Sequence, residues 1–140
     1  ARARDSSPTF RRLLGEISPS DLMFYVVRVA RERPAGATEL LGHGGGRRYL
    51  RVSLRADILG TGLAALIGHE LQHAVEIARS PETVDQATLQ QLLESIGRPA
   101  CGPPRWCFDT SDAVSAGAQV MKELSDGEND GNRQALSRRE

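Results

Sequence analysis

The sequence predicts an α+β domain in which a short mixed β-sheet packs against helices. Residues 21–54 are rich in β-branched and aromatic side chains and contain a glycine-rich turn, which is typical of strands. From residue 61 onward, apolar residues recur three and four positions apart, which is typical of helices. A chain of 140 residues suits one domain with a single core. We expect this domain to span residues 1–125.

A helix and a strand are predicted near the start of the chain. Ser7 is a suitable N-cap and Pro8 suits the first helical position, so a helix is expected over residues 7–18. The residues predicted to face the core are Leu13, Leu14 and Ile17. The run DLMFYVVRV at residues 21–29 is dense in apolar residues and too short for a helix, which predicts a buried strand.

Two further strands are predicted at residues 38–43 and 47–54, joined by a tight turn. Gly44, Gly45 and Gly46 supply this turn because glycine readily adopts the positive φ that a hairpin needs. The glycine run lacks the Lys-Ser/Thr ending and the following helix of a phosphate-binding loop. A hairpin is therefore the favoured interpretation.

Three helices are predicted in the second half of the chain. The first spans residues 61–79 and ends there because Pro81 disfavours a helical conformation in the residue before it. The second is expected to begin at Pro81 with Ser80 as its N-cap and to end before Gly97. The third is expected over residues 111–124.

Composition and charge narrow the classes of function. Residues 126–140 are polar and nearly without bulky apolar side chains, so we expect a disordered tail. No apolar run approaches the roughly 20 residues that a membrane helix needs.

The run RRYLRVSLR places Arg47, Arg51 and Arg55 on one face of a strand and Arg48 on the other. Because the net charge is zero and the run lacks a series of interleaved aromatic residues, we interpret it as a solvated strand face and expect no nucleic-acid partner.

Two cysteines lie close together in CGPPRWC, at Cys101 and Cys107. A disulfide that closes a small loop is one interpretation, and two reduced thiols are the other. A disulfide would favour an exported protein, and free thiols a cytoplasmic one. The start ARARDSSPTF contains no apolar signal segment, and a signal removed before residue 1 would look the same, so the localisation stays open. Nothing in the sequence indicates an oligomeric state.

Two of the three histidines, His69 and His73, stand one helical turn apart with Glu70 directly after the first. On a helix at about 100° per residue, both histidines share one face and the apolar residues occupy another. Two imidazoles at this spacing can bind one Zn²⁺, and the glutamate between them can take a proton from a bound water. HELQH thus matches the pattern HExxH at every fixed position.

HELQHAVEIA resembles the active-site helix of the zincin metallopeptidase superfamily, and residues 21–79 are similar to its minimal core. RRYLRVSL followed by LIGHELQHAVEIA also resembles a group of small bacterial zincin-like proteins. The resemblance implies a zincin-like domain and zinc-dependent hydrolysis of peptide bonds with Glu70 as general base. It also implies that a peptide or protein substrate binds along an edge strand, which would be TELLGH or RRYLRVSL.

A catalytic zinc needs a third protein ligand. The metzincin pattern HExxHxxGxxH is absent, because Glu76 replaces its glycine and Arg79 its last histidine. In gluzincin-like and aspzincin-like families this ligand is an acid from a later helix. Asp109 ranks first here because it follows an apolar Trp-Cys-Phe run, although it also suits a helix cap. Asp112 and Glu76 remain alternatives, and Glu76 is also placed to bond a histidine ring.

The remaining candidates are weaker. His43, beside the glycine turn, suits either a ligand or a solvated side chain, and Tyr25 and Tyr49 are possible hydrogen-bond donors to a reaction intermediate. Two functions lead: a zinc metallopeptidase, and a non-catalytic zinc-binding module or scaffold. A third, a hydrolase or nucleic-acid-associated enzyme that uses the same metal site, rests only on the arginine run. An intact Glu70 favours the peptidase, because a structural zinc needs no base and usually recruits cysteines.

Overall fold

The computed structural model describes residues 2–101 and 107–138 of the chain. It has the α+β architecture that the sequence predicts: a three-stranded mixed sheet packs against helices, and a small hairpin lies beside it. The elements in chain order are α1 (Arg2–Ser6), α2 (Pro8–Ile17), β1 (Leu22–Val29), β2 (Gly36–Gly44), β3 (Arg47–Arg55), α3 (Gly60–Ala78), α4 (Gln86–Ile96), β4 (Arg98–Cys101), β5 (Cys107–Asp109) and α5 (Ser111–Ser137).

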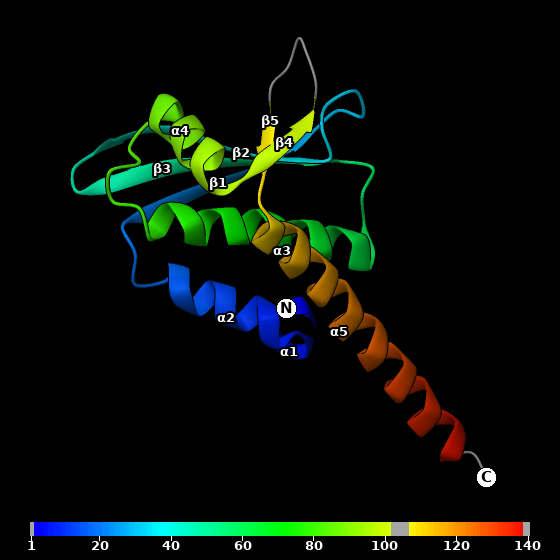
Figure 1. Cartoon of the computed structure of the whole chain (residues 1–140). Coiled ribbons are helices and arrows are strands. Elements are labelled where there is room, and N and C mark those ends of the chain that lie inside the picture. Colours follow the sequence, from blue (N-terminus) through cyan, green and yellow to red (C-terminus); the bar gives the residue numbers. More distant parts are fainter. Residues whose placement is uncertain (1, 102–106, 139–140) are drawn as a thin grey trace.

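Helix α3 lies in the middle of the fold (Figure 1). The three-stranded sheet covers one side of it, and α2 lies on the other side. Helix α5 crosses α3 and continues beyond the packed region (Figure 1). The HExxH residues of α3 line a cavity together with the start of β2 and the β4–β5 hairpin.

The sheet has the strand order β1–β3–β2, with β1 parallel and β2 antiparallel to β3. Strands β2 and β3 form the predicted hairpin. Its two turn residues, Gly45 and Gly46, have φ values of 58° and 72°, which confirms the reason for glycine at this turn. Because β3 is central, β1 and β2 form the two edges of the sheet, and of these two strands β2 lines a cavity together with residues of the HExxH motif.

Strand β1 is not the buried strand that its composition predicts. It lies at the edge of the sheet, and Tyr25 and Val26 have 53% and 63% of their surface exposed. Helix α3 packs under β2 and β3, so only the start of β1, at Leu22 and Phe24, reaches the core. An apolar run predicts a strand but does not show whether a neighbouring element covers it.

The core lies between the inner face of the sheet and the apolar face of α3. Leu40 and Leu50 from the sheet pack against Ala74, Val75 and Ile77 from α3. Helix α2 adds Leu13 and Ile17, both buried as predicted, whereas Leu14 is only partly buried. The periodicity of α2 therefore predicted its packing face correctly at two of three positions.

Small residues let α3 and α5 approach closely. A Cβ atom at Gly68 would lie 2.8 Å from a methyl carbon of Val120, and one at Gly117 would lie 3.1 Å from the carbonyl oxygen of Ala65. At the far end, the carboxylate of Glu123 accepts hydrogen bonds from the hydroxyls of Ser7 and Thr9. The glycine contacts hold the first part of α5 against α3, and the Glu123 hydrogen bonds hold α5 against the start of α2.

Arg48 is buried and connects four segments of the chain. Its Nη1 donates to the carbonyl oxygens of Ile77, Ser80 and Thr83 at 2.9, 2.8 and 2.9 Å. Its Nε and Nη2 both donate to the carboxylate of Asp21 at 2.8 Å, and this hydrogen bonding holds the pKa of Asp21 below its usual value. Arg48 therefore has a structural role that the interpretation of a solvated strand face misses.

This arginine also explains why α4 starts later than predicted. Helix α4 begins at Gln86 with Asp85 as its N-cap, and the predicted start at Pro81 with Ser80 as cap is wrong. Residues 80–83 form a turn whose carbonyl groups bond to Arg48. Thr88 and Asp85 then form a capping box, and the helix ends at Gly97 as predicted.

Helix α5 extends to Ser137, past the predicted end at residue 124. Residues 126–137 are therefore helical in the structure, where the sequence predicts a disordered tail. Every side chain from Asp126 to Arg138 is exposed, and Leu124 is the last buried residue. A polar composition correctly predicts the absence of packing, but no proline interrupts the helix after Leu124.

The outer face of the sheet carries paired charges. Arg51 bonds to Glu39, and Arg55 bonds to Asp57, each with an N–O distance of 2.8 Å.

In the part of the chain that the structure describes, no helix combines the length and apolar character needed to cross a membrane.

We expect Arg48→Met to lower the free energy of unfolding by about 3 kcal/mol, because three carbonyl groups and Asp21 lose their partner. Arg51→Met is the matched control on the same strand and should cost less than about 1 kcal/mol, since exposed ion pairs contribute little. Urea denaturation followed by circular dichroism measures both. Equal effects of the two substitutions would contradict the role given to Arg48.

Candidate metal centre

Three side chains converge between α3 and the end of the β4–β5 hairpin. His69 and His73 project from α3, and Asp109 is the last residue of β5. The Oδ1 atom of Asp109 lies 3.1 Å from Nε2 of His69 and 3.2 Å from Nε2 of His73. The three possible ligand atoms all lie within 4.8 Å of one another, so they are close enough to hold one metal ion.

The two distances to Asp109 fit the geometry of a metal site. Ligands at 2.0–2.1 Å around a tetrahedral zinc are separated from each other by roughly 3.3 Å. Two imidazole nitrogens and one carboxylate oxygen also form a ligand set that leaves one of four positions open. The group therefore has the ligand composition of a site that could hold a metal ion.

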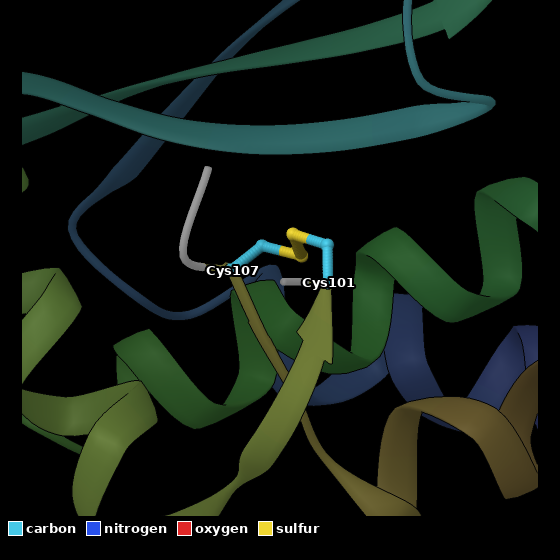
Figure 2. Close-up of a disulfide and its surroundings, with 2 residues drawn as sticks. All are labelled: Cys101 and Cys107. Atoms are coloured by element: carbon cyan, nitrogen blue, oxygen red, sulfur yellow. A yellow bond between two sulfur atoms is a disulfide. The ribbon is translucent and has the colours of Figure 1, made fainter. Parts of the chain in front are cut away.

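The β4–β5 hairpin delivers Asp109 to this position. Arg98 and Asp109 pair at its base, where Gly97 lets the chains approach closely because a Cβ there would lie 2.6 Å from the carbonyl oxygen of Asp109. Cys101 and Cys107 form a disulfide across the hairpin, and this bond faces α3 and the sheet (Figure 2). The sequence did not predict this hairpin, although it did present the disulfide as one interpretation.

The structure also separates Asp109 from the helix-cap role and from the alternative ligand Asp112. Thr110 caps α5 by accepting a hydrogen bond from the backbone N–H of Ala113, so Asp109 is not the helix cap. Asp112 lies in the first turn of α5 and is not part of the group of possible ligands. Trp106, the first residue of the apolar run that favoured Asp109, lies outside the described residues.

Glu76 bonds to the ring of His73, which is the second of the two roles that the sequence suggests for it. Its Oε2 lies 2.9 Å from Nδ1 of His73, and its Oε1 accepts a hydrogen bond of 2.6 Å from Thr110. Burial opposes protonation of His73, but the bond to Glu76 and nearby negative charges outweigh it and raise the pKa of His73. Because Nδ1 is engaged by Glu76, Nε2 is the ring nitrogen left to bind a metal.

Glu70 is buried beside the cluster, with only 4% of its surface exposed. Its Oε2 accepts a hydrogen bond of 2.7 Å from the hydroxyl of Thr38 on β2. Its Oε1 lies against Gly36, where a Cβ would be only 2.4 Å away. Burial raises the pKa of the Glu70 carboxyl, and the Thr38 hydrogen bond opposes this. A carboxylate with a raised pKa is suited to accept and return a proton near neutral pH.

A cavity of about 350 Å³ brings these groups to one surface. It is lined by His69, Glu70, His73 and Asp109, by the start of β2, by one face of α4 and by both cysteines. This volume is within the usual range for a ligand pocket. The possible ligands and the candidate base therefore face one cavity bordered by the edge of the sheet.

Three other predicted candidates lie elsewhere. His43 is exposed near the end of β2 and is not part of the group of possible ligands. Tyr25 and Tyr49 stack with their ring centres 6.5 Å apart on the face of the sheet opposite Leu50 and the core. Since α3 packs on the core face, these tyrosines do not reach the cavity, and their suggested role is wrong.

The sequence did not single out Gly36, Thr38 or Thr110 as residues of the site. Gly36 and Thr38 are alternate residues of one strand and therefore face α3 together. Their only sequence signal is a small residue and a hydroxyl residue two positions apart in a predicted edge strand, which is too common to indicate a site. For Thr110, the sequence signal is that of a helix cap, because threonine is favoured at this position.

No protein family model, curated protein or solved structure matches this chain. The resemblance to zincins therefore rests on the HExxH helix and on the group of possible ligands described above.

We expect Glu76→Gln to weaken zinc binding by about 10–100-fold, because the amide still accepts a hydrogen bond from His73 but no longer supplies a negative charge. Competition with a chromophoric chelator measures this affinity. Glu82→Gln, which changes an exposed acid just past the end of α3, is the control and should leave it unchanged. Equal affinities of the Glu76→Gln variant and the unaltered protein would contradict the role of Glu76.

Proposed function

We propose that this chain is a zinc-dependent metallopeptidase in which His69, His73 and Asp109 hold the zinc and Glu70 is the general base. The observation that carries the proposal is that both imidazole Nε2 atoms lie 3.1–3.2 Å from one oxygen of Asp109, beside the buried Glu70. A structural zinc usually has four protein ligands and needs no general base, so that role does not explain a buried carboxylate beside three possible ligands.

Each group has a defined task in the proposed reaction. When bound, the zinc lowers the pKa of a water and polarises the scissile carbonyl. Glu70 accepts the proton of the attacking water and later donates it to the leaving amine. Thr38 holds one oxygen of Glu70, which leaves the other oxygen as the proton acceptor. Glu76 fixes the ring of His73 through Nδ1.

The outer edge of β2 at Gly36 and Thr38 favours an extended peptide as the substrate. The carbonyl oxygen of Ala35 accepts a hydrogen bond from the N–H of Arg55 on β3. The N–H of Leu40 points away from β3 and donates to the side chain of Gln86. By the alternation of a strand, Gly36 and Thr38 also direct their backbone groups outward, into the cavity. A peptide can therefore add there as a further strand and lie across the possible metal ligands. This edge belongs to the TELLGH strand, one of the two that the resemblance implies.

Zinc content and peptide hydrolysis test this function together. The purified chain should contain about one zinc per molecule, and His69→Ala should abolish that binding. Glu70→Gln should retain the zinc and lower hydrolysis of a mixed peptide library by about 10²–10⁴-fold. Plasma mass spectrometry measures the metal, and mass spectrometry of the library measures cleavage.

Each outcome has a distinct meaning. Zinc without hydrolysis in the unaltered protein would favour the non-catalytic zinc module, and absence of zinc would contradict both functions.

Asp109→Asn and Asp112→Asn form a matched pair that separates the proposed ligand from its neighbour. Only the first should weaken zinc binding.

We expect Gly36→Ala to lower hydrolysis by about 100-fold while the zinc content stays the same. The added methyl group would lie 2.4 Å from Oε1 of Glu70 and displace the base, and misplacement by about 1 Å is worth roughly this factor. Gly44→Ala, on the same strand with no atom within 4 Å of the new Cβ, is the control and should retain activity. Full activity of the Gly36→Ala variant would contradict the position assigned to Glu70.

A further inference from the structure

Strand β1 exposes large apolar side chains on both faces of the sheet edge. Met23, Tyr25 and Val27 project from the outer face, and Val26 projects from the inner face beyond the part that reaches the core. All four are exposed, and they are consecutive in the strand apart from Phe24. Large apolar side chains gathered at one place mark an interaction surface more often than scattered ones do.

The backbone of β1 also has unpaired hydrogen-bonding groups along its outer edge. The carbonyl oxygens of Asp21 and Val29 accept hydrogen bonds from the N–H groups of Arg48 and Ala56, so the odd-numbered residues face β3. The even-numbered residues Phe24, Val26 and Arg28 therefore direct their N–H and C=O groups away from the sheet. Such a row is a template for another strand.

The features that usually protect an edge strand are missing from β1. Leu22–Val29 contains no proline, and its pairing with β3 has no bulge. Its one charged side chain, Arg28, folds back to donate to the carbonyl oxygens of Arg55, Ala56 and Ile58. The guanidinium is thereby held against its own chain and does not block an approaching strand.

We propose that β1 pairs antiparallel with β1 of a second copy of this chain, so that two three-stranded sheets form one six-stranded sheet. The charges favour this partner. Antiparallel pairing centred on Val26 places Asp21 of one copy opposite Arg31 of the other. Each already has a partner in its own chain, Arg48 and Asp57, but 41% of the Asp21 side chain and 81% of the Arg31 side chain stay exposed, so the two can also attract each other between copies. The net charge of zero also removes the overall repulsion between copies.

This interface is independent of the proposed peptidase. Strand β3 separates β1 from β2, so pairing at β1 leaves the β2 edge and the cavity accessible. Loss of pairing therefore does not alter zinc binding, and loss of zinc does not alter pairing.

The test is the mass of the full chain in solution, measured by light scattering and by sedimentation over a range of concentrations. The unaltered protein should be a dimer, and Val26→Lys should be a monomer because two lysines would face each other across the new strand pair. Val114→Lys places the same change at an exposed valine of α5 and should remain a dimer. A monomeric unaltered protein, or a dimer that persists in Val26→Lys, would overturn the proposal.

Amide hydrogen exchange by NMR tests the strand pairing residue by residue. The N–H groups of Phe24, Val26 and Arg28 should be protected in the unaltered dimer and exchange at least 10-fold faster in the monomeric Val26→Lys variant. The N–H groups of Tyr25 and Val27 should stay protected in both, because they face β3. Retained protection of Tyr25 and Val27 also shows that the variant is folded. Rapid exchange of Phe24 and Arg28 in the unaltered protein would exclude pairing through β1.

Discussion

The burial of α3 is the constraint on which the rest of this structure depends. The sheet covers one side of the helix and α2 and α5 cover the others, yet it carries Glu70, His73 and Glu76 into the interior. Buried polar groups must find hydrogen-bond partners inside the protein. Thr38 on β2 supplies one for Glu70, and Thr110 at the start of α5 supplies one for Glu76. The same bonds that make the fold possible thus orient the proposed catalytic groups.

The position of α3 is fixed at its C-terminal end and at its middle. Arg48 bonds to the carbonyl group of Ile77 at the end of the helix, and Gly68 lets α5 approach its middle. On the open side, the disulfide-closed hairpin holds Asp109 against both histidines. A metal that binds here would meet ligands that are already close together, which reduces the ordering cost of binding.

The sheet gives its two edges different proposed roles. The β2 edge borders the cavity, where Gly36 and Thr38 hold Glu70 on one side and offer backbone groups to a peptide on the other. The β1 edge is more apolar and lies across the sheet from the cavity, and we assign it to a second copy of the chain. Backbone pairing drives both interactions, and only the side chains around each edge distinguish them.

The sequence by itself determined the α+β class, the positions of the three strands of the main sheet, helix α3 and the roles proposed for His69, Glu70 and His73. These features depend on spacing within one element, which the chain itself specifies. The tertiary structure decided which acid meets the histidines, because Asp109 reaches them through a hairpin that local patterns did not indicate. It also decided the partners of Glu70 and Glu76, the late start of α4 around Arg48 and the exposure of β1. Each of these depends on which distant segment packs alongside, and no local periodicity carries that information.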